Sequence, residues 1–144
     1  MPSHIPADVR RRLEPVRLVV LDVDGVLTDG VLLYGPSGEA LKRFTVRDGL
    51  AMRLLRRAGI EVGVISGRSS DAVRRRCLDL GLREELIVQG SRGKGEHLDR
   101  LEALVGVADH EVAAVGDDLP DLPLLLRVGL AACPADAAAE VAAV

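Results

Sequence analysis

The sequence contains almost no aromatic side chains. Tyr34 and Phe44 are the two aromatic residues in the chain of 144, and tryptophan is absent. A hydrophobic core must therefore be built from Leu, Val, Ile and Ala, which the overall hydrophobic fraction of 48% supplies. A chain without an aromatic platform cannot bind single-stranded nucleic acid by stacking the bases.

Cysteine, histidine and long apolar runs are also scarce. Cys77 and Cys133 lack C-x-x-C spacing, and His4, His97 and His110 lack the spacing of metal ligands. We therefore expect two reduced thiols in the core, with neither a disulfide nor a zinc site. The apolar runs are far shorter than the roughly 18 residues of a membrane span. The first residues lack the apolar segment of a secretory signal, so we expect a cytoplasmic protein that does not enter membranes.

Neither sign of charge dominates the sequence. Nineteen Lys and Arg oppose 22 Asp and Glu, which gives a formal net charge of −3. This balance argues against a protein that binds nucleic acid by neutralising phosphates. The arginine clusters at 10–12 and 74–76 are expected to lie on solvated helix faces. The length predicts one domain that spans residues 1–144.

Short apolar runs alternate with segments of helical periodicity. Four runs predict strands: 17–22, 60–66, 85–88 and 111–115. The first run is typical of a strand buried on both faces. Three segments between them predict helices: 48–58, 69–81 and 94–105. The residues expected to face the core from these helices are Leu50, Leu54, Leu55, Ala58, Ala72, Val73, Cys77, Leu80, Leu98, Leu101, Leu104 and Val105. A further helix, a short strand and a last helix complete the chain.

A glycine-rich turn interrupts this alternation after the first strand. The tetrapeptide Gly35-Pro36-Ser37-Gly38 joins two extended segments and predicts a β-hairpin over 31–44. Strands alternating with helices form βαβ units, whose right-handed crossovers cover both faces of a parallel sheet. The sequence thus predicts an α/β fold: a doubly wound, mostly parallel sheet with a β-hairpin insertion after the first strand.

Polar residues follow the predicted strands where each one ends. Asp22 and Asp24 follow the first strand, Ser66 follows the second, and Asp117 follows the last, while Lys94 opens the helix after the remaining strand. Ligands of open parallel sheets bind at these carboxyl ends. Clustered carboxylates repel one another unless a cation neutralises them, and an oxygen-only ligand set favours Mg²⁺ over Zn²⁺. Such a metal site with a lysine and a hydroxyl suits phosphoryl transfer.

Several other sites can be weighed against this interpretation. An isolated D-x-D motif is often only a loop feature, and the convergence of three strand ends is what favours a catalytic role. An EF-hand starting at Asp22 fails because Val26 occupies a ligand position. The chain has no Walker motif, and no G-x-G-x-x-G follows the first strand. A phospho-receiver domain places its aspartate and lysine on strands in an order that this chain does not show.

Longer motifs resemble the haloacid dehalogenase superfamily. The matching segments are DVDGVLTDG (22–30), TVRDG (45–49), ISGR (65–68), Lys94 and GDDLPD (116–121). The resemblance runs from about residue 17 to the end of the chain. It is strongest to the capless phosphatases of this superfamily that act on phosphorylated sugar acids, and it implies a HAD-like, Rossmannoid fold.

The resemblance also implies roles for the residues at the strand ends. Asp22 would be the nucleophile that forms an aspartyl-phosphate, and Asp24 the general acid and base. Ser66 would bind a phosphoryl oxygen, and Lys94 would neutralise nucleophile and phosphate. The implied ligands of Mg²⁺ are Asp22, the backbone carbonyl of Asp24, and Asp117. The remaining acids, Asp118 and Asp121, would orient Lys94 and the metal-bound waters.

A second group of residues is implied to contact the substrate. Its members are Thr45, Val46, Arg47, Asp48, Gly49, Arg53, Gly67, Arg68 and Arg76. Arginines near a phosphate site suit a sugar acid, because its carboxylate matches the planar fork of a guanidinium. Arg53 and Arg76 lie on arginine-rich helices, where simple solvent exposure is an alternative explanation.

The resemblance further implies a homotetramer. Between Thr28 and Ser66 the chain has room for only a hairpin and one helix, so we expect no large cap domain there. In the family the hairpin at 31–44 pairs with those of other subunits, which complete each site. Relatives also continue beyond the position of Val144 with a tail that reaches a neighbouring site. The implied partner is a small phosphorylated sugar acid of eight carbons. Three alternatives stay open: a phosphatase of acylneuraminate or ketodeoxynonulosonate 9-phosphate, a non-catalytic tetramerisation module, and a receiver switch with a stable aspartyl-phosphate.

Overall fold

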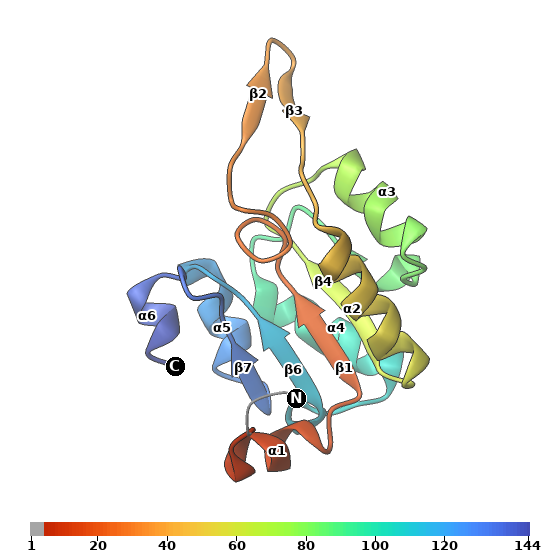
Figure 1. Cartoon of the computed structure of the whole chain (residues 1–144), viewed down its shortest axis with the longest axis vertical. Helices are drawn as coiled ribbons and strands as arrows, with labels where there is room; N and C mark the ends of the chain where they lie inside the picture. Colours follow the sequence, from red (N-terminus) through yellow and green to blue (C-terminus); the bar gives the residue numbers. More distant parts are fainter. Residues whose placement is uncertain (1–4) are drawn as a thin grey trace.

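The computed structural model describes residues 5–144 and is built around a five-stranded parallel sheet (Figure 1). The strand order is β5-β4-β1-β6-β7. The strands are β1 (Leu18–Leu21), β4 (Glu61–Ile65), β5 (Ile87–Val88), β6 (Val112–Val115) and β7 (Leu130–Ala132). The chain winds outward from β1 to β4 and β5, then returns to the other side of β1 with β6 and β7. The point where the direction of winding reverses lies between β1 and β6, and ligands of such sheets bind there.

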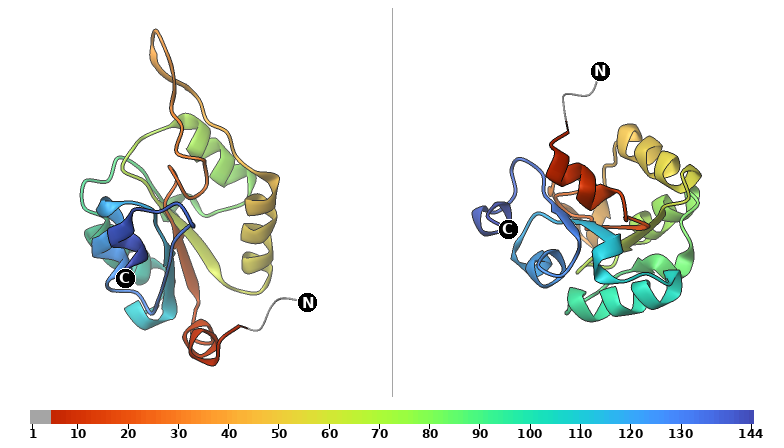
Figure 2. Two further views of the ribbon diagram at one scale, coloured as in Figure 1. Left: turned by 60° about the vertical axis from the view of Figure 1, so that its left-hand side comes forward. Right: turned by 90° about the horizontal axis from the view of Figure 1, so that it is seen from below.

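Helices cover both faces of the sheet (Figure 2). One face is covered by α2 (Val46–Arg57) and α3 (Asp71–Asp79). The other is covered by α4 (Lys94–Val105), α5 (Leu122–Leu125) and α6 (Ala139–Ala142). The helix α1 (Ala7–Leu13) packs beside β7. Short 3₁₀ turns lie at Glu84–Leu86, Asp109–Glu111 and Leu119–Asp121.

Alternation along β1 divides the core into two layers. Val19 and Leu21 pack with the residues of α2 and α3, whereas Leu18 and Val20 pack with those of α4 and α5. All four are buried, as expected for a strand covered on both faces. The predicted α/β fold, with its parallel sheet and inserted hairpin, is confirmed.

Three helix faces differ from the prediction. On α2, Leu50 and Leu54 are exposed, and Gly49 and Met52 are buried instead. A Cβ at position 49 would lie 2.5 Å from the guanidinium of Arg76 on α3 and 3.0 Å from Cδ2 of Leu80, so a larger residue there would have to displace these side chains. The buried face of α2 thus carries a glycine and a methionine, and the two leucines lie on the solvent side.

Further positions on α3, on α4 and near the sheet edges also differ from the prediction. Ala72 is exposed because Val73 and Cys77 form the inner face of α3. Leu104 is exposed, and Glu102 is buried on the same helix. Cys133 is exposed just beyond the edge strand β7, so the prediction of two core thiols holds for Cys77 alone. The strand predicted over 85–88 is a 3₁₀ turn followed by only two strand residues.

The hairpin consists of β2 (Leu33–Gly35) and β3 (Gly38–Leu41), which pair antiparallel. It projects from the body of the molecule beyond the sheet (Figures 1 and 2). Its strands are shorter than predicted because the chain leaves the pairing after Leu41, where the side chain of Lys42 turns toward Asp24. Within residues 5–144, no helix is both long enough and apolar enough to cross a membrane.

Candidate active site

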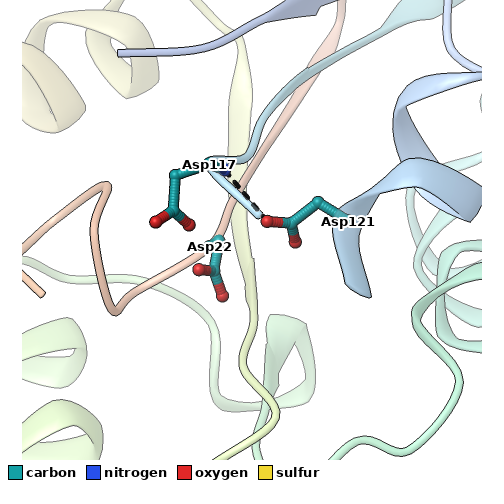
Figure 3. Close-up of side chains that lie close together, drawn as sticks. All are labelled: Asp22, Asp117 and Asp121. Atoms are coloured by element: carbon teal, nitrogen blue, oxygen red, sulfur yellow. Dashed lines mark hydrogen bonds between the residues drawn. The ribbon is translucent and has the colours of Figure 1, made fainter. Parts of the chain in front are cut away.

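Three carboxylates meet where β1 and β6 end (Figure 3). Asp22 directly follows β1, Asp117 lies two residues after β6, and Asp121 ends the 3₁₀ turn at 119–121. Each offers an oxygen within 4.8 Å of the others. The backbone amides of Asp117 and Asp118 donate to Oδ2 of Asp121, at 3.0 and 3.2 Å, which fixes this carboxylate beside the loop. Three carboxylates, two that follow strands and one from the 3₁₀ turn, thus form one cluster of negative charge.

Lys94 is the buried cation of this cluster. Its Nζ lies 2.6 Å from Oδ1 of Asp22 and also donates to Oδ1 of Asp121. Burial alone would lower the pKa of Lys94, but the two carboxylates more than offset it and raise the pKa above its usual range. The lysine therefore stays charged and ties the first residue of α4 to the end of β1.

One ammonium does not balance three carboxylates. Burial raises the pKa of Asp22 in spite of Lys94, and burial together with the neighbouring acids raises the pKa of Asp117 to about 6. The space for Asp117 depends on Gly25, where a Cβ would lie 1.9 Å from Oδ2 of that aspartate. An all-oxygen donor set with excess negative charge fits a divalent cation.

Asp24 lies outside the three-acid cluster, against two cations. Oδ1 of Asp24 accepts from the ammonium of Lys42, which also lies 3.2 Å from Oε2 of Glu39. Nε of Arg68 lies 4.0 Å from Oδ2 of Asp24. Sequence reasoning missed Lys42 and Glu39. The available signal was the place of Lys42 at the base of a hairpin inserted directly after the first strand end, while Glu39 lies in β3 of the same hairpin, next to the turn.

Ser66 and Arg68 reach the site from β4. Ser66 is buried, and its Oγ accepts the backbone N–H of Arg68 at 3.2 Å across Gly67. The guanidinium of Arg68 donates to the hydroxyl of Tyr34 at 2.8 Å and lies 3.4 Å from Glu39. The end of β4 is thereby connected to the hairpin.

The segment 45–49 forms the beginning of α2. Oγ1 of Thr45 accepts the N–H of Asp48 at 3.1 Å, which caps the helix. Arg76 donates to the carbonyl of Thr45 at 3.2 Å, so it lies with this group. Val46 and Arg47 are exposed, and with Asp48 they line an open hollow.

Two other residues stand apart from the cluster. Arg53 lies further along α2 in a different hollow, with Arg56 and Arg57. No hydrogen bond or ion pair of residues 5–144 joins Arg53 to the carboxylates. Asp118 is exposed, and its side chain accepts the N–H of Leu119 at 2.8 Å, which caps the 3₁₀ turn. Asp118 and Asp121 were both expected to orient Lys94, and of the two it is Asp121 that contacts this lysine.

An acidic cluster with a buried lysine and a nearby hydroxyl, at the carboxyl edge of a parallel sheet, is the arrangement of a phosphoryl-transfer enzyme. More specifically, the chain belongs to the haloacid dehalogenase-like hydrolases, whose family model matches residues 37–129.

Within this family, the chain is similar to several phosphatases of one name. The 3-deoxy-D-manno-octulosonate 8-phosphate phosphatase KdsC of Escherichia coli (strain K12) is 43% identical over 133 residues, which cover 92% of this chain and 70% of that protein. The crystal structure of the phosphatase of the same name from Yersinia pestis superposes with a TM-score of 0.92 at 37% identity, over 96% of this chain and 74% of that one. The Moraxella catarrhalis phosphatase, solved in complex with magnesium ion, phosphate ion and KDO, gives a TM-score of 0.87 at 34% identity, over 93% of this chain and 76% of that one.

Proposed function

We propose that this protein is a 3-deoxy-D-manno-octulosonate 8-phosphate phosphatase that requires Mg²⁺. The observation that carries the proposal is the carboxylate of Asp22, held by Lys94 beside Asp117 and Asp121. The relatives that bear this name share about two fifths of their residues with nearly the whole chain. The magnesium and KDO of the Moraxella complex support the choice of metal and of product.

In the first step, a carboxylate oxygen of Asp22 attacks the phosphorus of the substrate. The bond from phosphorus to the sugar oxygen breaks, and Asp24 donates a proton to that oxygen as it leaves. The ammonium of Lys94 opposes the effect of burial on the pKa of Asp22 and so favours its charged, nucleophilic form. Ser66, buried at the end of β4, would donate its hydroxyl hydrogen to a phosphoryl oxygen.

In the second step, the aspartyl-phosphate is hydrolysed. Asp24, now a carboxylate, takes a proton from water, and the water oxygen forms the new bond to phosphorus. The bond from phosphorus to Asp22 breaks and releases phosphate. Asp22, the carbonyl of Asp24 and Asp117 would hold Mg²⁺, and Asp121 lies close enough to be a further ligand. The bound cation would neutralise charge on the phosphoryl oxygens.

Substrate contacts form the next part of the proposal. Arg68 is supported as a ligand of the sugar acid by its place at 4.0 Å from Asp24. Thr45–Gly49, Arg76 and Gly67 are proposed as further contacts, because Arg76 lies on the carbonyl of Thr45 and Gly67 lies between Ser66 and Arg68. Arg53 stays a prediction, since its surroundings on α2 do not lead to the carboxylates.

Assembly and location complete the proposal. We propose that the chain is one catalytic domain whose hairpin forms a homotetramer, so that neighbouring subunits close the site. Support comes from the exposed apolar residues of the hairpin, which would otherwise form an unprotected edge. The two free cysteines agree with a reducing cytoplasm.

The test is phosphate release from 3-deoxy-D-manno-octulosonate 8-phosphate, compared with N-acetylneuraminate 9-phosphate. We expect turnover of the eight-carbon substrate that stops when EDTA removes the metal and returns with added Mg²⁺. The Asp22→Asn variant, which keeps the size of the side chain but not its charge, should lose at least about a thousandfold in kcat.

Each other outcome points to a different alternative. Faster turnover of the nine-carbon substrate would reassign the enzyme. A folded protein that releases phosphate from neither would support the scaffold alternative, and a long-lived aspartyl-phosphate on the wild-type protein would support a receiver switch.

A further inference from the structure

Lys42 is a cation with a buried side chain near the site, and the proposed mechanism gives it no role. Its side chain is 2% exposed, although it comes from the base of a hairpin whose apolar residues face solvent. A buried ammonium costs free energy unless carboxylates compensate it. Its two partners are Asp24 and Glu39. The fold thus buries the ammonium of Lys42 against the carboxylate of Asp24.

Glu39 holds this cation in place. Oε2 of Glu39 lies 3.2 Å from Nζ of Lys42 and 3.4 Å from the guanidinium of Arg68. Although burial opposes it, these cations lower the pKa of Glu39, so the carboxylate stays charged. Both cations that approach Asp24 are therefore fixed by one hairpin residue.

Lys42 also determines the orientation of Asp24. Within residues 5–144, the ammonium of Lys42 donates the hydrogen bond that the Asp24 side chain accepts, while Arg68 lies further away at 4.0 Å. Asp24 itself sits in the loop after β1, and its side chain is 21% exposed. A carboxylate so placed can rotate about its side-chain bonds once its partner is removed.

We infer that Lys42 is a positioning residue that orients Asp24 for both proton transfers. This inference rests on the proposed function, in which Asp24 acts as general acid and then as general base. Because Lys42 belongs to the hairpin segment, the position of the hairpin is coupled to the orientation of the Asp24 side chain. Within residues 5–144, no hydrogen bond or ion pair joins Lys42 to the three-acid cluster or to Lys94, so its removal leaves the contact between Lys94 and the nucleophile in place. At Asp24, Lys42 contacts the side chain and not the backbone carbonyl that is proposed to hold Mg²⁺.

The test replaces Lys42 by Met, which keeps the length of the side chain and removes its charge, and by Arg, which keeps the charge. The matched control is Arg75→Met, which removes an exposed cation on α3 that pairs with Asp79. Each variant is assayed with 3-deoxy-D-manno-octulosonate 8-phosphate and with p-nitrophenyl phosphate. The kinetic constants are compared with those of Asp24→Asn, and thermal unfolding checks that every variant is folded.

The two substrates distinguish an effect on formation of the aspartyl-phosphate from an effect on its hydrolysis. kcat/KM reports formation of the aspartyl-phosphate, which needs a proton for a sugar alkoxide but not for nitrophenolate, a good leaving group. Lys42→Met should lower kcat/KM on the sugar phosphate at least about tenfold and change it less than about threefold on the aryl phosphate. It should lower kcat on both, because both share the hydrolysis of the same aspartyl-phosphate. Lys42→Arg should recover most of the loss, and Arg75→Met should behave as the wild-type protein.

Equal losses of kcat/KM on the two substrates would overturn the inference, because they would indicate a general loss of the site. So would an unchanged kcat in Lys42→Met. If the wild-type protein releases no phosphate from the sugar substrate, the proposed function fails first. If the wild-type protein is active and Lys42→Met matches it, only the role of Lys42 fails.

Discussion

At the scale of the residue, Glu102 is a carboxylate that α4 buries far from the catalytic cluster. Burial first, and then the hydrogen bond and charge of Asp109, raise its pKa to about 7, although Arg127 opposes this. Asp99 adds a smaller effect of the same sign as Asp109. At acidic pH the protonated Glu102 can donate to the carboxylate of Asp109, and at higher pH that bond becomes a repulsion.

The direction of the pH effect follows from proton binding. The folded state holds a proton on Glu102 over a range of pH in which the unfolded chain, with a pKa near 4.5, has released it. The free energy of unfolding should therefore decrease as the pH rises from 5 to 8, by about 1–3 kcal/mol. Asp109 has a lowered pKa, so its stabilising contribution is lost only below this range. Urea denaturation at each pH measures the change.

Glu102→Gln should flatten this dependence, because the amide donates to Asp109 at every pH. The exposed Glu96→Gln on the same helix is the matched control and should follow the wild-type curve. Raised pKa values at Asp22 and Asp117 act in the same direction in all three proteins. Only the difference between wild type and Glu102→Gln therefore isolates Glu102, and parallel curves for these two would contradict the assignment.

At the scale of the element, the loop after β1 depends on a glycine. Gly25 has φ of +93°, a conformation that favours glycine, and its missing Cβ leaves room for the carboxylate of Asp117. Gly59, which follows α2, has a similar φ of +82° but no atom within 4 Å of the Cβ position. Comparing substitutions at these two glycines therefore separates the effect of backbone strain from the effect of crowding against Asp117.

Both Gly→Ala substitutions should cost about 1–2 kcal/mol of stability through backbone strain. Gly25→Ala should in addition displace Asp117, so that half-maximal activity requires at least about tenfold more Mg²⁺. Gly59→Ala should leave the metal requirement unchanged. Thermal unfolding and activity titrated against the metal measure the two effects, and equal metal requirements in both variants would show that Gly25 does not set the position of Asp117.

The elements also show how far the sequence could predict the structure. Two patterns predict the succession of strands and helices along the chain and the sheet edge that carries the site. They are the apolar runs that end in acid, as at Asp22, and the periodic segments that end at glycines such as Gly59. Helix orientation was not predictable in the same way. Leu50 and Leu54 obey the helical period, yet they are exposed, and the face of α2 that packs on the sheet carries Gly49 and Met52.

The strand pattern predicts the part of the site that follows strands, whereas Asp121 is expected only from the family resemblance and Lys42 from neither. Asp22, Ser66 and Asp117 each come directly after a strand or one residue later, so their meeting follows from the parallel sheet. The contact of Lys42 with Asp24 depends on how the hairpin leaves the sheet, which no periodicity encodes. Asp121 lies in the cluster because the 3₁₀ turn at 119–121 folds it back.

At the scale of the whole molecule, the hairpin is an exposed apolar extension. The side chains of Tyr34 and Leu41 are 65% and 66% exposed, and Val31 and Leu33 are also largely exposed. A soluble monomer seldom carries so many large apolar residues on one free edge, because such an edge pairs with other chains. The arrangement therefore favours an assembly in which hairpins cover one another.

A charge placed on this surface should break the assembly. We expect the wild-type protein to have the mass of a tetramer, four times 15.3 kDa or about 61 kDa, and Leu41→Lys to have that of a smaller species. Four lysine charges brought into one apolar interface would repel one another and lose their hydration. Light scattering coupled to size exclusion measures both masses. The matched control is Leu126→Lys, an equally exposed leucine after α5, which should leave the mass unchanged.

Activity then distinguishes the two ways in which the hairpin serves the site. Lys42 reaches Asp24 within one chain, so a folded, dissociated Leu41→Lys protein keeps that contact and should retain turnover of the small p-nitrophenyl phosphate. Closure of the site by neighbours would be lost, and kcat/KM for the sugar acid phosphate should fall at least about tenfold. A dissociated variant with full activity on the sugar substrate would show that one chain suffices for catalysis, and a wild-type mass near 15.3 kDa would contradict the assembly itself.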